Sequence, residues 1–115
     1  MRRFAKMAAD AALQSELQFT HGAVVVRNGK AVGRAACNRY GKGGWEHSVH
    51  AEVAALREAG GRRSSSGGTL YVVRVGKDGS LRESHPCPWC LGRMRQLNVH
   101  KCIYSTNDGL RCIKI

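Results

Sequence analysis

Residues 86–106 read PCPWCLGRMRQLNVHKCIYST, and the order of structural signals in this stretch decides the fold. The backbone N–H of the first helical residue has no partner within the helix, so proline, which lacks this N–H, is common at that position. Pro88 therefore predicts the start of a helix over 88–98. Residues 101–106 predict a strand. A turn signal at 107–109 separates this strand from a last strand over 110–115, and so short a connection makes the pair antiparallel.

Helical and strand periodicities alternate through the rest of the chain as well. Upstream, we predict a helix over 3–17, a hairpin of strands 23–26 and 31–36 around Asn28-Gly29, a buried helix over 49–59 closed by Gly60-Gly61, and a strand over 69–75. The remaining segments, 38–48, 60–68 and 76–85, are predicted loops. The GGRRSSSGG sequence of 60–68 indicates a flexible connector that does not pack. The predicted order αββαβαββ gives one α/β domain over 1–115, with helices covering a mixed sheet.

Composition narrows the function classes. Nineteen Lys and Arg against eight Asp and Glu leave a formal charge of +11, which favours nucleic acid or a phosphorylated ligand as partner. A basic surface kept only for solubility is the alternative. No run approaches the roughly 18 apolar residues of a membrane span, and the N-terminus lacks the apolar region of a secretory signal. We therefore expect an intracellular protein, cytoplasmic or nuclear, that does not bind membranes.

Two short motifs carry the chemistry, His50-Ala51-Glu52 and Pro86-Cys87-Pro88-Trp89-Cys90. One imidazole and two thiolates supply three ligands for zinc and leave the fourth tetrahedral position open for water, as in catalytic zinc sites. Glu52 would lie near the metal without binding it and could move protons between water and a leaving nitrogen. A closed structural zinc site or a redox pair of cysteines is the alternative. An odd count of five cysteines and no secretory signal argue against a disulfide framework.

The combination of H-A-E with P-C-x-x-C, on these elements and in this order, resembles the cytidine deaminase-like superfamily. The resemblance runs from the hairpin through the last strand. It implies a three-layer-type α/β sandwich of the cytidine deaminase fold, with a mixed sheet of about five strands. It also implies that His50, Cys87 and Cys90 bind Zn²⁺, that Glu52 shuttles protons, and that the reaction is hydrolytic deamination at C4 of cytosine or C6 of adenine.

The resemblance further implies a substrate contact at Asn38, since related deaminases often place an Asn there against the base or sugar. The alternative is a plain turn residue. Free-nucleoside deaminases have Asn-x-Glu at this point, whereas Arg39 and Tyr40 follow here, so the carboxylate is missing. An arginine at the rim suits a phosphate better than a hydroxyl.

Three further residues are predicted to contact the substrate. Trp45, with Tyr40 and Arg39, suits a single strand whose bases stack and whose phosphates pair, although ordinary loop packing is an equal alternative. Trp89 could stack on a base or simply pack beside the zinc ligands. His85 could line the pocket. His21 is explained as a strand-end residue.

These features disagree on the substrate. The charge and Arg39 favour a phosphorylated substrate, whereas the antiparallel last strands resemble the free-nucleoside and nucleoside-antibiotic branch. We predict zinc-dependent deamination of cytosine to uracil in single-stranded nucleic acid, with DNA favoured, or in a phosphorylated nucleotide. The alternatives are a free-nucleoside or nucleoside-antibiotic deaminase, a tRNA adenosine-type deaminase, and a basic zinc module that only binds nucleic acid. A homo-oligomer is compatible with all of them.

Overall fold

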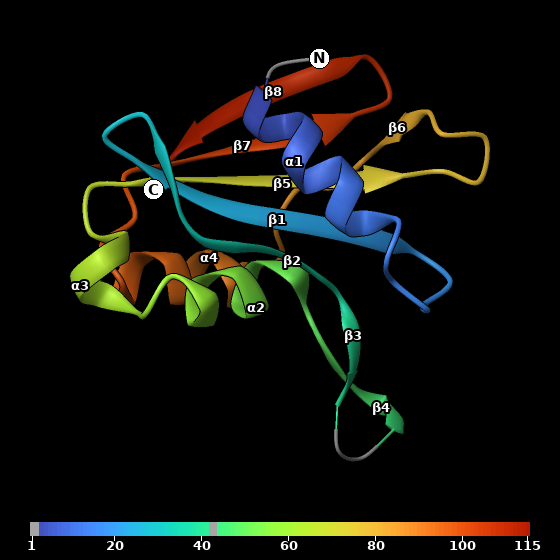
Figure 1. Cartoon of the computed structure of the whole chain (residues 1–115), viewed down its shortest axis with the longest axis horizontal. Helices are drawn as coiled ribbons and strands as arrows, with labels where there is room; N and C mark the ends of the chain where they lie inside the picture. The colour runs from blue at the N-terminus through green and yellow to red at the C-terminus, as the bar shows by residue number, and fades with distance from the viewer. Residues whose placement is uncertain (1–2, 42–43) are drawn as a thin grey trace.

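A computed structural model describes residues 3–41 and 44–115, and side chains for 3–41 and 48–115 (Figure 1). The helices are α1 (Arg3–Ala12), α2 (Ala51–Glu58), α3 (Arg62–Ser65) and α4 (Pro88–Gln96). The strands are β1 (Thr20–Arg27), β2 (Lys30–Cys37), β3 (Arg39–Gly41), β4 (Gly44–Val49), β5 (Thr69–Val75), β6 (Leu81–Arg82), β7 (Lys101–Thr106) and β8 (Gly109–Lys114).

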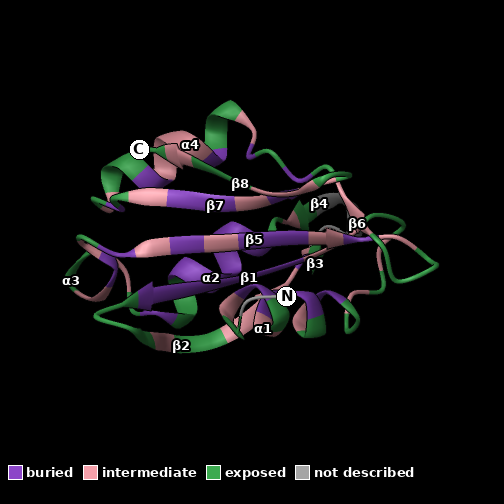
Figure 2. Cartoon of the chain, turned by 90° about the horizontal axis from the view of Figure 1, so that it is seen from above, coloured by how far each residue is buried: buried purple, intermediate pink, exposed green. Residues whose placement is uncertain are grey.

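A six-stranded mixed sheet forms the middle layer, with the order β2-β1-β5-β7-β8 and with β6 paired to the end of β5. β5 and β7 are parallel, and the other neighbours in this sheet are antiparallel, including β7 with β8. Helix α1 covers one face of the sheet, and α2 and α4 cover the other (Figures 1 and 2). The predicted three-layer fold and the antiparallel last strands are confirmed, and the sheet has one strand more than the predicted five.

Side chains along β1 alternate between two cores. Ala23 and Val25 pack with α2 and α4, whereas Val24 and Val26 pack with α1. This is the period of two expected of a strand that is buried on both faces. The alternation fixes which side chains of β1 face the functional helices.

Helix α1 approaches β1 so closely that only glycine fits at position 22. A Cβ atom built there would lie 1.8 Å from the backbone oxygen of Ala8 and 2.6 Å from the nitrogen of Ala12. The facing side of α1 is made of alanines, whose small side chains allow this approach. α1 therefore rests directly on the strand that enters the functional site.

The β1–β2 hairpin has the turn that its sequence predicts. Asn28 and Gly29 adopt positive φ angles of 53° and 75°, as a two-residue hairpin loop of this kind requires. Strands β5 and β7 have the bounds predicted from the sequence, 69–75 and 101–106.

The connections differ from prediction. The first helix ends at Ala12 rather than at residue 17, where the Ser15 hydroxyl accepts the N–H of Leu17 in place of a helical partner. Segment 38–48 is not a loop, because β3 and β4 within it pair with each other. Segment 76–85 contains β6, which pairs with β5.

The segment over 60–68 packs, contrary to prediction. It contains α3, and Ser65 and Gly68 are buried. The N–H of Gly67 donates to the carbonyl of Asn98, and the N–H of His100 donates to the carbonyl of Gly68. These tertiary hydrogen bonds order a composition that is typical of a flexible connector.

Across residues 3–41 and 44–115, the helices are all too short or too polar to cross a membrane.

Candidate active site

The three predicted metal ligands come together between α2 and α4. The Nδ1 atom of His50 lies 3.2 Å from Sγ of Cys90 and 3.9 Å from Sγ of Cys87, and all three donor atoms lie within 4.8 Å of one another. Ligands around a tetrahedral zinc, with Zn–N of about 2.0 Å and Zn–S of about 2.3 Å, are separated by roughly 3.5–3.8 Å. The donor types and their spacing therefore fit Zn²⁺.

Two helix N-termini hold these ligands. His50 is the N-cap of α2 and Cys87 is the N-cap of α4, and both have extended backbone geometry. Cys90 lies in the first turn of α4 and is fully buried. Because backbone N–H groups at a helix start carry partial positive charge, both helices favour thiolates at this point.

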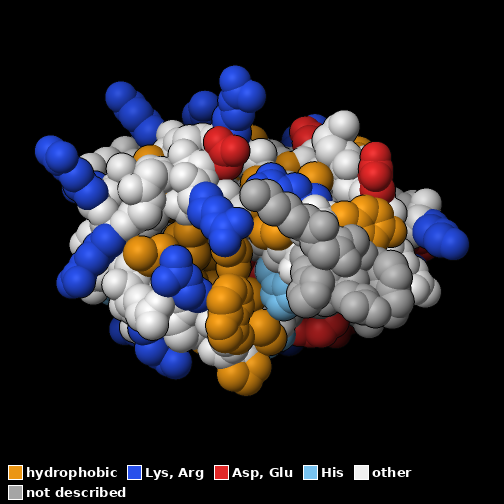
Figure 3. Space-filling view, turned by 90° about the horizontal axis from the view of Figure 1, so that it is seen from below, with side chains coloured by type: hydrophobic (Ala, Val, Ile, Leu, Met, Phe, Trp, Pro, Cys, Tyr) orange, Lys and Arg blue, Asp and Glu red, His pale blue; other side chains and the backbone are white. Residues whose placement is uncertain are grey.

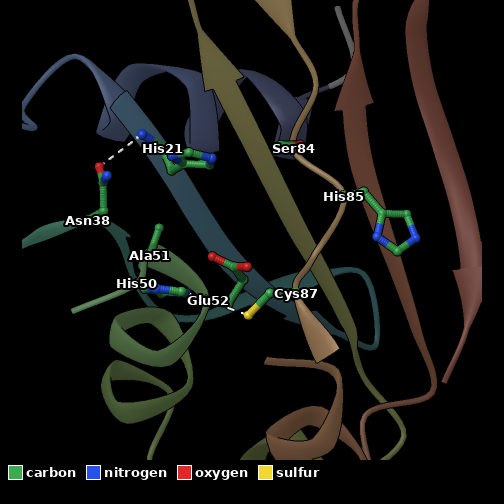
Figure 4. A pocket seen from close by; sticks show the side chains of 8 residues that line it. All are labelled: His21, Asn38, His50, Ala51, Glu52, Ser84, His85 and Cys87. Atoms are coloured by element: carbon green, nitrogen blue, oxygen red, sulfur yellow. Dashed lines mark hydrogen bonds between the residues drawn. The ribbon is translucent and has the colours of Figure 1, made fainter. Parts of the chain in front are cut away.

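Glu52 lies in the first turn of α2 and is only 5% exposed. Its carboxylate points into the pocket beside the His50–Cys87 contact (Figure 4). Burial raises the pKa of the Cys90 thiol, and the negative charge of nearby Glu52 acts in the same direction. A divalent cation held by the cluster would offset both effects and stabilise the thiolate.

A pocket of about 170 Å³ opens beside this cluster. Its lining residues are His21, Asn38, His50, Ala51, Glu52, Ser84, His85 and Cys87 (Figure 4). Pockets for drug-sized ligands occupy roughly 300–1,000 Å³. This pocket is therefore of a size to take a single ring system, and the rest of a larger substrate would lie outside it.

Asn38 is buried at the end of β2 and uses both ends of its amide on the start of β1. Its Oδ1 accepts the backbone N–H of His21 at 2.9 Å, and its Nδ2 donates to the carbonyl of Phe19 at 2.6 Å. Asn38 lines the pocket, and its amide also fixes the start of β1, which carries His21.

His21 lines the pocket, although its place in the sequence indicated only a turn or strand-end residue. Its Nδ1 lies 3.2 Å from the Phe19 carbonyl, which can only accept, so Nδ1 carries the proton and Nε2 of the neutral ring is an acceptor. Burial lowers the pKa of His21 and favours this neutral form. The alternation of side chains along β1 could have indicated this position. His21 lies on the same face of the strand as Ala23 and Val25, which pack towards α2 and α4.

Ser84 also lines the pocket, and it anchors the segment that leads to Cys87. Its hydroxyl lies 2.8 Å from that of Ser105 on β7 and donates to the carbonyl of Val72 on β5. This buried contact ties the chain before the P-C-x-x-C motif to two neighbouring strands. Nothing in the sequence marked Ser84 for this role.

The remaining predicted substrate residues are dispersed. Arg39 and Tyr40 are exposed in β3. His85 lines the pocket, but its ring packs edge-on against Tyr104. Trp89 is 61% exposed and lies edge-on to His50, where it lines a second hollow of about 420 Å³. Trp45 belongs to β4, but its side chain falls outside the described part of the structure.

Comparison with known proteins agrees with this geometry. The sequence model of the family described as the cytidine and deoxycytidylate deaminase zinc-binding region matches residues 1–106. The chain belongs to this family, and its cofactor is Zn²⁺. Curated protein sequences give no match.

Solved structures share the fold. A dCMP deaminase from the cyanophage S-TIM5 is 23% identical with a TM-score of 0.66, covering 90% of this chain and 84% of that one. A mutant cytidine deaminase from Mycobacterium tuberculosis is 21% identical with a TM-score of 0.62, covering 94% and 86%. RibD from Acinetobacter baumannii is 21% identical with a TM-score of 0.60, and the match covers 88% of this chain but 26% of that one.

Proposed function

We propose that this protein catalyses the hydrolytic deamination of cytosine to uracil in a phosphorylated substrate, either a nucleotide or single-stranded nucleic acid, with DNA favoured. The observation that carries the proposal is the buried carboxylate of Glu52 beside the His50, Cys87 and Cys90 donor set, in a pocket sized for one ring. Three protein ligands would leave the fourth position of a bound zinc open for water, as in catalytic zinc sites.

The residues of the chain divide the reaction among them. When bound, zinc supplies a Lewis acid that lowers the pKa of a water molecule. Glu52 is placed to accept a proton from the attacking water and to deliver it to the amino nitrogen at C4. The new C4–O bond forms, the C4–N bond breaks, and ammonia leaves. His21 lines the same pocket, and its Nε2 acceptor can receive a hydrogen bond from a bound nucleoside.

Charge supports a phosphorylated substrate. The formal charge is +11, and Lys and Arg side chains are spread over the face that also exposes histidine (Figure 3). A cyanophage dCMP deaminase solved in complex with dCMP and dUMP shares the fold at a TM-score of 0.63, 22% identity, and coverage of 90% of this chain and 82% of that one. Both observations favour a substrate that carries phosphate.

A free nucleoside is the second candidate, favoured by the antiparallel pairing of β7 with β8. That pairing is the arrangement that resembles the nucleoside and nucleoside-antibiotic branch, and it argues against a tRNA adenosine-type enzyme. A zinc module that only binds nucleic acid would need no carboxylate in the pocket.

The test is a parallel incubation of zinc-loaded protein with cytidine, dCMP, and single-stranded DNA and RNA oligonucleotides that contain one cytosine. Uracil is scored in each, and inosine is scored with an adenosine oligonucleotide. We expect uracil from dCMP or from an oligonucleotide at a higher kcat/KM than from cytidine. Efficient turnover of cytidine alone would support the second candidate, and turnover of no substrate would support the binding module.

A further inference from the structure

A further hollow, separate from the catalytic pocket and from the hollow that Trp89 lines, lies between the start of β1 and the β5–β6 hairpin. Its volume is about 690 Å³. We call it the Phe19–Arg74 cleft, and its lining residues are Leu13, Leu17, Gln18, Phe19, Thr20, Arg74, Val75, Gly76, Lys77, Asp78 and Arg82. The zinc site uses none of these residues, so the cleft is distinct from the pocket described above.

The cleft adjoins the catalytic pocket through β1 and β5. His21 and Arg74 are directly paired across these strands, so their side chains leave the same face of the sheet as neighbours. His21 lines the pocket, and Arg74 lines the cleft. The Phe19 carbonyl also bonds to the side chains of Asn38 and His21, which both line the pocket. The pocket and the cleft therefore lie side by side across the His21–Arg74 pair.

The cleft combines an aromatic ring with an excess of positive charge. The guanidinium of Arg74 lies 4.5 Å from the centre of the Phe19 ring, and Phe19 is still 54% exposed. Lys77 and Arg82 add two further cations, and Asp78, which pairs with Arg82 at 3.5 Å, adds one anion. Exposed aromatic rings and cations are what proteins use to hold bases and phosphates of single strands.

The size of the two hollows decides what part of a substrate each can hold. A pocket of about 170 Å³ takes a base, and a cleft of about 690 Å³ exceeds what one phosphate needs. A lone phosphate would also make no use of an exposed aromatic ring.

We infer that the Phe19–Arg74 cleft binds the nucleotide next to the target cytosine in a single strand, with Arg74 at the connecting phosphate and Phe19 stacked on the neighbouring base. The inference rests on the proposed function, and it narrows the substrate from any phosphorylated cytosine to a strand of at least two nucleotides. Both DNA and RNA present this chemistry.

Binding of a fluorescent five-nucleotide DNA strand, thymidines around one central cytosine, tests the inference by anisotropy with zinc-loaded full-length protein. We expect Arg74→Gln and Phe19→Leu each to weaken binding about five- to tenfold, because a charged contact or a stacked base is lost. Arg74→Gln should also reduce the slope of log affinity against log salt by about 0.7. Phe19→Trp, which keeps an aromatic face, should bind the strand with an affinity close to that of the wild type.

Arg62→Gln is the matched control. Arg62 is exposed in α3, which precedes the start of β5, whereas Arg74 lies near its end. The control loses the same charge and should bind the strand like the wild type. Equal affinities for Arg62→Gln, Arg74→Gln and Phe19→Leu would overturn the inference.

Turnover separates this inference from the proposed function. The ratio of kcat/KM for the oligonucleotide to that for dCMP should fall at least fivefold in Arg74→Gln and Phe19→Leu. An equal loss on both substrates would assign the cleft to the nucleotide's own phosphate and overturn the inference. If wild-type protein turns over no cytosine substrate, the proposed function fails, and the anisotropy series still decides whether the cleft binds a strand. An RNA version of the strand shows which sugar is preferred.

Discussion

Replacement of Asn38 by alanine should destabilise the protein and also slow its turnover of substrate. The Asn38 amide joins the end of β2 to the start of β1 through two hydrogen bonds, from the His21 N–H and to the Phe19 carbonyl. Alanine removes both and leaves the backbone bond from the Asn38 N–H to the His21 carbonyl in place. The variant therefore tests the side chain alone.

The structure sets the size of the effect. A buried group left without its partner costs about 1–3 kcal/mol. The Phe19 carbonyl keeps the Nδ1–H of His21 as a donor, so this loss lies at the low end. The bond that the His21 backbone N–H loses is partly buried. We expect the free energy of unfolding to fall by about 2–3 kcal/mol, out of the roughly 5–15 kcal/mol typical of a domain. Turnover should fall about tenfold or more, because the pocket wall loses its fixed position.

Urea denaturation of the zinc-loaded protein measures the stability change, and uracil formation measures the turnover. Asn107→Ala is the control, since Asn107 is an exposed residue of the β7–β8 turn. Asn38→Asp keeps an acceptor for the His21 N–H but loses the donor to Phe19, so it should lose stability as well. Equal stability of Asn38→Ala and Asn107→Ala would refute this reasoning. A loss of turnover without a loss of stability would instead mean that Asn38 acts by touching the substrate.

Three further substitutions test the site and its scaffold. Glu52→Gln should lower kcat by about 10²- to 10⁴-fold with zinc retained. The control Glu58→Gln, at an exposed residue of the same helix, should remain active, and turnover and metal content are measured for both variants. Gly22→Ala should lower the unfolding free energy by about 1–3 kcal/mol, since its Cβ would collide with the Ala8 oxygen, and unchanged urea denaturation would contradict the packing. Cys90→Ala should abolish the binding of one zinc per chain and lower the melting temperature, as chelation should in the wild type; a folded, active, zinc-free protein would refute the assignment.

Local signals were sufficient to predict the β1–β2 turn, two of the strands and the starts of the helices that carry the predicted zinc ligands. Asn28-Gly29 forms its turn by backbone preference alone, and the bounds of β5 and β7 follow from runs of β-branched and aromatic residues. His50 and Cys87 could be placed at helix starts because a loop before an apolar stripe and a proline both mark such starts. The candidate metal site could therefore be predicted from local signals alone.

Tertiary contacts decided what the sequence did not reveal. Segment 60–68 has the composition of a flexible connector, yet hydrogen bonds to Asn98 and His100 order it and Ser65 is buried. Residues 39–41 and 44–49 form strands because each supplies the other's partner. Such pairings join segments whose individual sequences show no preference, so periodicity within one segment could not predict them.

The cleft was hidden for a related reason, since it depends on the register between strands far apart in sequence. β1 pairs with β5 without interruption from Thr20 to Val26. Alternating core residues hold that register, because a slip by one residue would turn the side chains of Ala23 and Val25 away from α2 and towards α1. The same slip would move His21 off the pocket and separate it from Arg74. Small apolar side chains pack on both faces of β1 and hold its register. They therefore fix which polar side chains lie beside the pocket and the cleft at the start of this strand. We therefore expect a core substitution that loosens β1 to weaken both catalysis and the binding of a single-stranded oligonucleotide.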